Sequence, residues 1–380
     1  MFSVRRSTVT VAAILALAGP GGVGSTVASA LAQEIQPVTV VDSGDLPSGE
    51  RGVQRLVQRA AERTRNRDYQ GAIEDLTLAL RLHHELDRSR ADLYVALGNA
   101  RLGARDYAGA LEEFDRALQF NSSSIEAYAG RAKVRAALGD RQGALNEFAQ
   151  ALQRNPNSAE LYASRGSFLS ENGDPRAAIE DLTRALQLNP RNADYYSSRG
   201  YARSNAGDAA GAVEDFTSAL ALSPNTVDFL IGRGYARSSS NDARGAVADF
   251  SRALELDPNR AEAYIARAYA RGNLGDARGA VEDFTQAIQR NPNGAEAYVG
   301  RAYARVTLGD RQAAIDDFTQ ALTIDANAAD ALVGRGYARA DGGDREGALA
   351  DFNRAAEILR ARGDAKRLQE VTEAIASAQQ

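Results

Sequence analysis

Arginine and acidic side chains recur at a constant spacing along most of the chain. An arginine stands sixteen residues before an acid, as in Arg301 with Asp317 and Arg267 with Asp283. Guanidinium and carboxylate groups in such a pattern could form either a basic stripe that binds an anion or a set of internal ion pairs. Because base and acid recur together, we favour internal pairs and expect Arg301 to bind Asp317.

Residues that commonly carry catalysis or bind metal ions are scarce. The chain has no cysteine and two histidines, the neighbours His83 and His84. Adjacent residues on a helix point about 100° apart, so these two side chains cannot easily share one ion. The carboxylates are periodic, which is typical of a solvated or salt-bridged face. We therefore expect no catalytic, metal or cofactor site and no enzymatic activity.

A row of tyrosines recurs every thirty-four residues in the C-terminal half, and an aliphatic residue stands four positions before each of the last four. Tyrosine offers a large rigid surface and a hydrogen-bonding hydroxyl at a low cost in entropy. The row could therefore form a groove for an extended peptide, or its rings could simply cover helix backbone. The predicted ligand-binding residues are Tyr201, Tyr235, Tyr269, Tyr303, Tyr337, Ile231, Ile265, Val299 and Val333.

A repeat of thirty-four residues must position these side chains. The segments that begin at Ala261 and Ala295 align without a gap. Within each repeat, a glycine such as Gly275 ends one helix and an acid begins the next. Small residues at positions 8, 20 and 27 allow close helix approach, and large residues at positions 4 and 24 fill the space between the helices. Each repeat is predicted to be a helix–turn–helix unit that stacks on its neighbours.

The spacing of these landmarks resembles the tetratricopeptide repeat. The resemblance implies an all-α fold, a right-handed α-solenoid of nine repeats over residues 53–362, whose first helices line a concave face. The chain departs from the family pattern where arginine replaces the usual leucine at position 7, and where Arg67, Arg105 and Asn241 replace the turn glycine. The landmarks in one repeat are Tyr264, Ala268, Gly275, Ala280, Phe284, Ala287 and Pro292, and the repeats are predicted to begin at residues 53, 91, 125, 159, 193, 227, 261, 295 and 329.

The ends of the array have their own features. The first repeat is four residues longer than the others, about one helical turn, which predicts a longer second helix there. Residues 363–380 are predicted to form a capping helix and tail, because arrays of this kind need a helix that covers the last repeat. Its apolar stripe consists of Leu368, Val371, Ile375 and Ala378.

The first 32 residues have the order of a secretory signal peptide. Arg5 and Arg6 precede a short apolar stretch, and small residues follow up to Ala32. The apolar stretch is shorter than the roughly 20 residues that span a bilayer, so we expect cleavage after Ala32, with an uncleaved inner-membrane signal anchor as the alternative. Residues 33–52 contain proline and glycine without a helical period, which predicts a flexible leader. The mature chain is then expected to be periplasmic or secreted, without a membrane span.

The composition narrows the expected partners. A formal net charge of −5 does not favour nucleic-acid binding. Acids such as Glu262 and Glu296 at position 2 would favour basic ligands, although an acid at a helix start also complements the helix dipole. We expect a non-catalytic scaffold of the bacterial cell envelope that binds a protein or peptide through its concave face. The alternatives are a structural component of an envelope assembly and a component of a secretion or polysaccharide-export complex.

Overall fold

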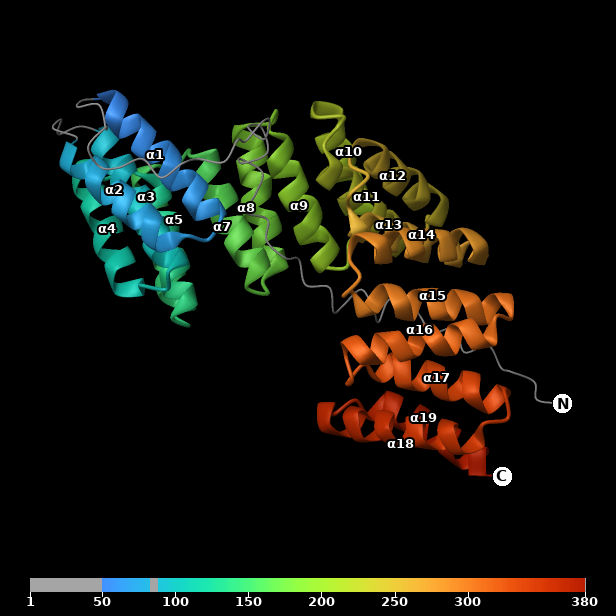
Figure 1. The fold of residues 1–380 in the computed structure, drawn as a ribbon. Coiled ribbons are helices and arrows are strands. Elements are labelled where there is room, and N and C mark those ends of the chain that lie inside the picture. Colours follow the sequence, from blue (N-terminus) through green and yellow to red (C-terminus); the bar gives the residue numbers. More distant parts are fainter. Residues whose placement is uncertain (1–49, 83–87, 380) are drawn as a thin grey trace. The chain divides into compact units, whose positions relative to one another are not determined.

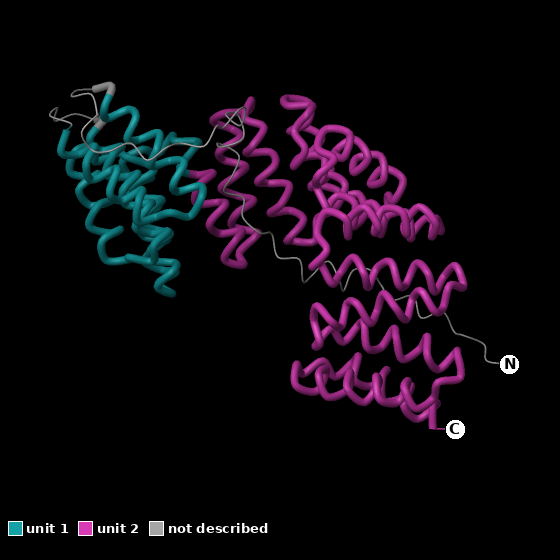
Figure 2. The backbone as a smooth tube through the Cα atoms, in the orientation of Figure 1, with its two compact units in different colours: residues 1–161 teal, residues 162–380 magenta. Residues whose placement is uncertain are grey.

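The computed structural model describes residues 50–82 and 88–379, and these residues form helices joined by short turns, without strands (Figure 1). The chain divides into two compact units, residues 1–161 and 162–380 (Figure 2). The predicted signal peptide (1–32), most of the predicted leader (33–52), and the pair His83 and His84 lie outside the described residues.

Unit 1 contains three pairs of antiparallel helices and the beginning of a seventh helix. The first helix begins at Glu50, so residues 50–52, which are predicted to belong to the leader, are part of this helix. Its first buried side chain, Val53, lies about one turn after the start of the helix. The helices are α1 (Glu50–Arg65), α2 (Tyr69–Leu82), α3 (Arg88–Gly103), α4 (Tyr107–Phe120), α5 (Ile125–Ala137), α6 (Arg141–Arg154) and α7 (Ala159–Glu171).

Unit 2 begins with the rest of α7 and also consists of alternating first and second helices of the repeats. Each odd-numbered helix from α9 packs against the even-numbered helix that follows it, and successive odd-numbered helices also contact one another. The helices are α8 (Pro175–Leu188), α9 (Ala193–Asn205), α10 (Ala209–Leu222), α11 (Val227–Ser239), α12 (Ala243–Leu256), α13 (Ala261–Asn273), α14 (Ala277–Arg290), α15 (Ala295–Leu308), α16 (Arg311–Ile324), α17 (Ala329–Asp341), α18 (Arg345–Arg362) and α19 (Ala365–Gln379).

The turn inside each pair has the conformation that the sequence predicts. Gly275 has a φ of 81°, in the left-handed region that glycine adopts without steric cost. Asp276 then caps α14, because its carboxylate accepts a hydrogen bond from the Gly279 amide. Arg105 and Asn241 occupy the same turn position and also have positive φ, 61° and 66°. The turn is therefore imposed by the packing of the helices even where glycine is absent.

The core consists of aromatic rings from the second helices, held between small residues of the first helices. Phe216 in α10 is fully buried. A Cβ atom added to Gly200, in its own repeat, would lie 3.0 Å from the Phe216 ring, and one added to Gly232, in the next repeat, would lie 2.5 Å from it. The small residues thus admit one ring between two successive first helices, which joins each repeat to its neighbour.

The array ends with a capping helix, as the apolar stripe predicts. Helix α19 packs on α18, and Val371 and Ala374 are buried in the same cluster as Leu359. Leu368, Ile375 and Ala378 are partly buried against that cluster. A guanidinium of this helix, from Arg367, also pairs with Asp330 at the start of α17. The last apolar surface of the array is therefore covered by α19.

Candidate functional site

The predicted pairs of arginine and acid are present. In the repeat that contains α15 and α16, Arg301 donates to both carboxylate oxygens of Asp317, at 2.9 Å from Nε and 2.7 Å from Nη2. Arg267 and Asp283 form the same fork at 2.9 and 2.6 Å. Asp317 is buried, so it needs such a partner to remain charged inside the protein. These pairs belong to the interior of the helix stack.

Two further contacts extend each pair into a network that sequence reasoning missed. Arg305, one turn after Arg301, donates from Nη1 to the same Asp317 carboxylate at 2.7 Å. Arg301 Nη1 donates to Thr285 Oγ1 in the preceding repeat at 3.1 Å. A hydroxyl recurs at that position as Thr183, Thr217, Ser251 and Thr319, and this recurrence is the signal in the sequence that could have revealed the link. The network joins neighbouring repeats.

The tyrosine rings of the predicted binding row lie on the first helices of unit 2. Each packs edge-to-face on the buried phenylalanine of its own repeat, with centroids separated by 4.9 Å for Tyr201 and Phe216 and by 5.1 Å for Tyr303 and Phe318. Such aromatic pairs add stability beyond the burial of area. One part of each ring therefore belongs to the core, which is the alternative that the sequence left open.

The tyrosine hydroxyls reach the start of the next first helix. Tyr303 donates to the backbone carbonyl of Asp330 at 3.1 Å, and Tyr235 donates to the Glu262 carboxylate at 3.3 Å. Tyr201 similarly reaches the carbonyl of Asp228 at 3.4 Å. The acids at position 2 thus stand beside the hydroxyls of the preceding repeat, in addition to their place at a helix N-terminus.

Exposure changes along the row. Tyr201, Tyr235 and Tyr269 are half-buried, whereas Tyr303 is 39% and Tyr337 is 53% exposed. Burial raises the pKa of Tyr201 to about 12, and burial, followed by the charges of Glu370 and Glu373, raises the pKa of Tyr337. The hydroxyls therefore remain protonated near neutral pH and can donate hydrogen bonds. The accessible part of the row lies at its C-terminal end.

The aliphatic members of the predicted site are placed unevenly. Ile265, Val299 and Val333 are half-buried beside the row. Ile231 is only 5% exposed and packs in the same cluster as Phe250. It thus has little surface to offer a ligand in this structure. The reason is local packing, since Ile231 belongs to a buried cluster contributed by several helices, which the recurrence of aliphatic residues in the sequence could not reveal.

A family model described as tetratricopeptide repeat matches residues 58–125, 169–227, 265–329 and 301–365, and a second model of the same description matches residues 147–180. The first model alone covers more than half of the chain. The chain is a tetratricopeptide repeat protein. Proteins of this kind are generally scaffolds that bind proteins or peptides, and the fold is typically non-catalytic. No curated protein matches the sequence.

Solved structures with the same fold are distant in sequence. The hetero-tetramer Cut9–Hcn1 of the APC/C matches over 90% of this tetratricopeptide repeat chain and 79% of its own, with a TM-score of 0.52 and 13% identity. PilW, a type IV pilus biogenesis factor, matches over 55% and 96%, with a TM-score of 0.49 and 20% identity. YrrB, described as having an unusual peptide-binding site, matches over 49% and 95%, with a TM-score of 0.43 and 22% identity. These likenesses concern the fold alone.

The described part of this tetratricopeptide repeat protein lacks two other common functional features. Residues 50–82 and 88–379 contain no group of three or more histidine, cysteine or acidic residues that could hold a metal ion. Within the same ranges, no helix has the length and apolar character needed to cross a membrane.

Proposed function

We propose that this tetratricopeptide repeat protein is a non-catalytic scaffold of the bacterial cell envelope, which binds a protein or an extended peptide on the first helices of unit 2. The observation that carries the proposal is the exposure of Tyr303 and Tyr337, since aromatic rings anchored on a rigid wall are preferred contact residues. Val306, on the same helix as Tyr303, adds exposed apolar surface. The binding surface is defined as Tyr269, Tyr303, Tyr337, Val299, Val306 and Val333.

The charge around this binding surface favours a basic ligand. Glu262 and Glu296 are exposed beside the row, and Glu370 and Glu373 of α19 are close enough to Tyr337 to raise its pKa. Acidic groups at the rim of a contact surface attract partners of opposite charge and exclude acidic ones. The proposed partner is therefore an extended segment with lysine or arginine residues and intervening apolar side chains.

The proposed location depends on residues 1–32, whose order of basic, apolar and small residues is that of a signal peptide. After cleavage following Ala32, the mature chain would begin at Gln33 and be periplasmic or secreted. N-terminal sequencing of the protein recovered from fractionated cells tests this part directly. A chain that retains residues 1–32 in the inner membrane would instead support the signal-anchor alternative.

The binding proposal is tested with a photo-reactive residue in place of Tyr337 in the exporting cell. The captured protein is then purified, and its affinity for the scaffold is measured. The double variant Tyr303→Ala, Tyr337→Ala should lose about tenfold or more in affinity, the equivalent of about 1.4 kcal/mol. The control is Leu274→Ala, Leu308→Ala, which removes exposed apolar side chains, at 46% and 40% exposure, from the turn ends of α13 and α15.

The two alternatives give different results in this experiment. If the protein is a structural component of an envelope assembly that uses other surfaces, the tyrosine variants keep their partner with unchanged affinity. If it handles polysaccharide, a glycan array gives binding that depends on the tyrosines, because sugars also stack on aromatic rings. Intact folding of each variant is checked by its melting midpoint, since Tyr303 also contacts the core ring of Phe318.

A further inference from the structure

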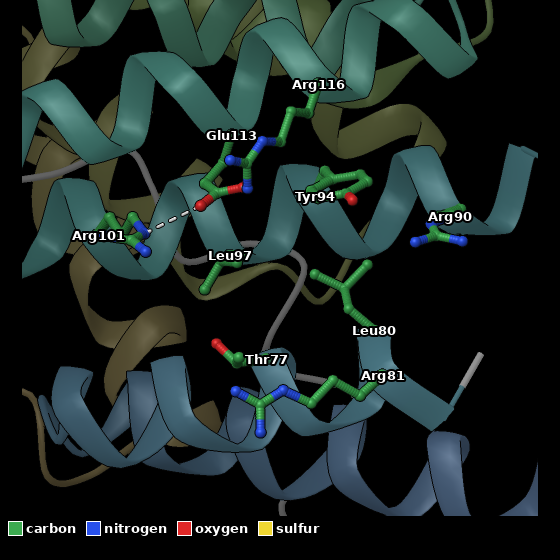
Figure 3. Close-up of a pocket in the computed structure, with 9 residues that line it drawn as sticks. All are labelled: Thr77, Leu80, Arg81, Arg90, Tyr94, Leu97, Arg101, Glu113 and Arg116. Carbon is green, nitrogen blue, oxygen red and sulfur yellow. Dashed lines mark hydrogen bonds and ion pairs between the residues drawn. The ribbon is translucent and has the colours of Figure 1, made fainter. Parts of the chain in front are cut away.

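The second repeat differs from the others at one position of the arginine network. The other repeats have arginine at position 7, and the second has Leu97. Leucine cannot reach the space that the guanidinium occupies elsewhere, and a cavity of about 440 Å³ is found there, between α2, α3 and α4 (Figure 3). Its lining residues are Thr77, Leu80, Arg81, Arg90, Tyr94, Leu97, Arg101, Glu113 and Arg116.

The acid of this repeat is already neutralised without an arginine at position 97. Arg101 Nε lies 3.3 Å from one oxygen of Glu113, and Arg116 donates to the other at 3.1 Å. The Arg116 guanidinium also lies over the Tyr94 ring, 6.0 Å from its centroid, as Arg267 lies over Tyr264 at 5.6 Å. Arg116 thus takes over, from a different helix, the contacts of the missing arginine with the acid and with the ring, which leaves the space beside Leu97 open.

The cavity has an excess of positive charge. Its lining holds four arginines and one carboxylate. Two of these arginines, Arg101 and Arg116, also pair with Asp106 and Glu112 outside the lining, so the excess rests on Arg81 and Arg90. The Nε atom of Arg90 is buried and has no hydrogen-bond acceptor among the described residues, and the buried Nε atom of Arg101 has only its ion-pair contact with Glu113. A buried N–H group without an acceptor costs about 1–3 kcal/mol, more when it is charged. The Arg90 donor, on the same face of α3 as Arg101, therefore needs an acceptor that the described lining does not provide.

Neighbouring aromatic rings hold one of these arginines in place. The Arg90 guanidinium lies over the Phe120 ring, 5.5 Å from its centroid, and Phe120 in turn stacks on Tyr94 with centroids 5.6 Å apart. A guanidinium fixed by ring contacts loses less entropy when it binds an anion. In the third repeat, Ser124 stands at the position of Arg90. The arginine that recurs at this position, Arg260, pairs instead with Asp228 and Asp257.

We propose that this cavity is a binding site for an oxyanion, the carboxylate or phosphate group of a small organic acid. The anion accepts hydrogen bonds from Arg90 and Arg101, because planar guanidinium groups match the geometry of carboxylate and phosphate oxygens. Leu80 and Leu97 contact the carbon part of the ligand. The site lies in unit 1 and uses no residue of the tyrosine row, so it is independent of the binding surface proposed above.

The test is calorimetric titration of the full mature chain with inorganic phosphate and with citrate, at constant ionic strength maintained with sodium chloride. We expect saturable binding of one anion per chain, accompanied by a rise in the melting midpoint. A free carboxylate at the end of a peptide could supply the same chemistry, so a short acidic peptide is compared with its C-terminal amide. Tighter binding of the peptide with the free carboxylate would identify a peptide end, rather than a free small acid, as the source.

Two variants distinguish a specific binding site from nonspecific attraction of anions to arginine side chains. Leu97→Arg restores the side chain that the other repeats carry and fills the cavity, so it should fold and lose about tenfold or more in anion affinity. Arg90→Gln should weaken binding by a similar factor, because it removes a charge-assisted donor. The double variant Tyr303→Ala, Tyr337→Ala should bind the anion as the wild type does.

Arg131→Leu provides the matched control. It gives the third repeat a leucine at position 7, as the second repeat has in Leu97. Because the third repeat has Ser124 in place of Arg90, this variant should create no second site, and the stoichiometry should remain one anion per chain. The proposal is overturned if neither phosphate nor citrate binds saturably, or if Leu97→Arg binds either anion as tightly as the wild type does. Either result can be distinguished from failure of the tyrosine surface, because that surface is measured by a different partner and different variants.

Discussion

Arg301 connects three helices through one guanidinium. It donates from Nε and Nη2 to the two oxygens of Asp317 in α16, at 2.9 and 2.7 Å, and from Nη1 to Thr285 in α14, at 3.1 Å. The first contact holds the two helices of one repeat together, and the second joins that repeat to the preceding one. The stability of such an array is approximately the sum of the stability of each repeat and of the contacts between neighbouring repeats.

Arg301→Leu should therefore lower stability rather than binding. Removing one partner of a buried ion pair costs about 3–5 kcal/mol, but Asp317 keeps Arg305 at 2.7 Å, so we expect a loss of about 2–4 kcal/mol. Chemical unfolding measures the loss, and hydrogen exchange should locate it in α14 to α16. Arg354→Leu, at an exposed pair with Glu357, is the control and should cost less than about 1 kcal/mol. A fall in partner affinity at an unchanged melting midpoint would contradict the structural role.

Arg105→Gly should stabilise the protein. Arg105 is exposed and has a φ of 61°, and the left-handed conformation costs a residue with a Cβ atom about 1–2 kcal/mol. Because glycine also has more freedom in the unfolded chain, we expect a net gain of about 0.5–1 kcal/mol in the free energy of unfolding.

Gly275→Ala is the reciprocal change to Arg105→Gly. Gly275 has a φ of 81°, and a Cβ atom built there meets no atom within 4 Å, so any cost comes from the backbone alone. It should destabilise by about 1 kcal/mol in the same chemical-unfolding assay. If both glycine variants left the unfolding midpoint unchanged, backbone strain at these turns would be negligible.

Gly232→Val should disrupt the contact between two repeats. A Cβ atom at residue 232 would lie 2.5 Å from the Phe216 ring, closer than van der Waals contact allows. The ring is fully buried, so overpacking should cost about 1–3 kcal/mol. Thermal unfolding measures the cost, and Gly272→Val serves as control because a Cβ atom at Gly272 meets nothing within 4 Å. In the control variant, stability changes only through the difference in helix propensity between glycine and valine. Equal losses of stability in the two variants would therefore contradict the proposed contact.

Stability should fall in alkaline solution as the tyrosine row ionises. Burial raises the pKa of Tyr201 to about 12 from its ordinary value of 10.0, because the neutral phenol is favoured inside the protein. The contribution of this group is complete below pH 10 and is lost as the pH rises toward 12. Urea unfolding across this range should show a smaller loss for Tyr201→Phe, which has no proton to release. An equal loss in both proteins would mean that other groups control the alkaline transition.

Much of the fold can be predicted from the sequence because the repeat imposes the same local choices many times. Glycine and aspartate at the turn, as in Gly275 and Asp276, predict where one helix ends and the next begins, and the structure has both features. The pairing of Arg301 with Asp317 is also predicted, since opposite charges that recur together at one spacing favour internal pairs. The exact number of repeats and the signal peptide stay predictions.

The candidate site is harder to predict from the sequence than the fold is. The tyrosine row follows from periodicity, but its hydroxyl contacts join residues 27 positions apart, as in Tyr303 and Asp330, and depend on how two repeats stack. The burial of Ile231 depends in the same way on a cluster contributed by several helices. Sequence patterns describe which side of a helix a residue occupies, whereas the exposed fraction of a side chain depends on the elements that cover that side.

The cavity beside Leu97 shows most clearly which features follow from the sequence and which depend on the tertiary structure. From the sequence alone, the thirty-four-residue period determined the helical hairpins, their turns and the pairing of arginine with acid as in Arg301 and Asp317, because these follow from residue type and spacing. Only the tertiary structure decided that Arg116 replaces the missing arginine and that Arg90 and Arg101 are left with buried donors. Those outcomes depend on which side chains from three different helices meet in one volume, and spacing along a chain does not contain that information.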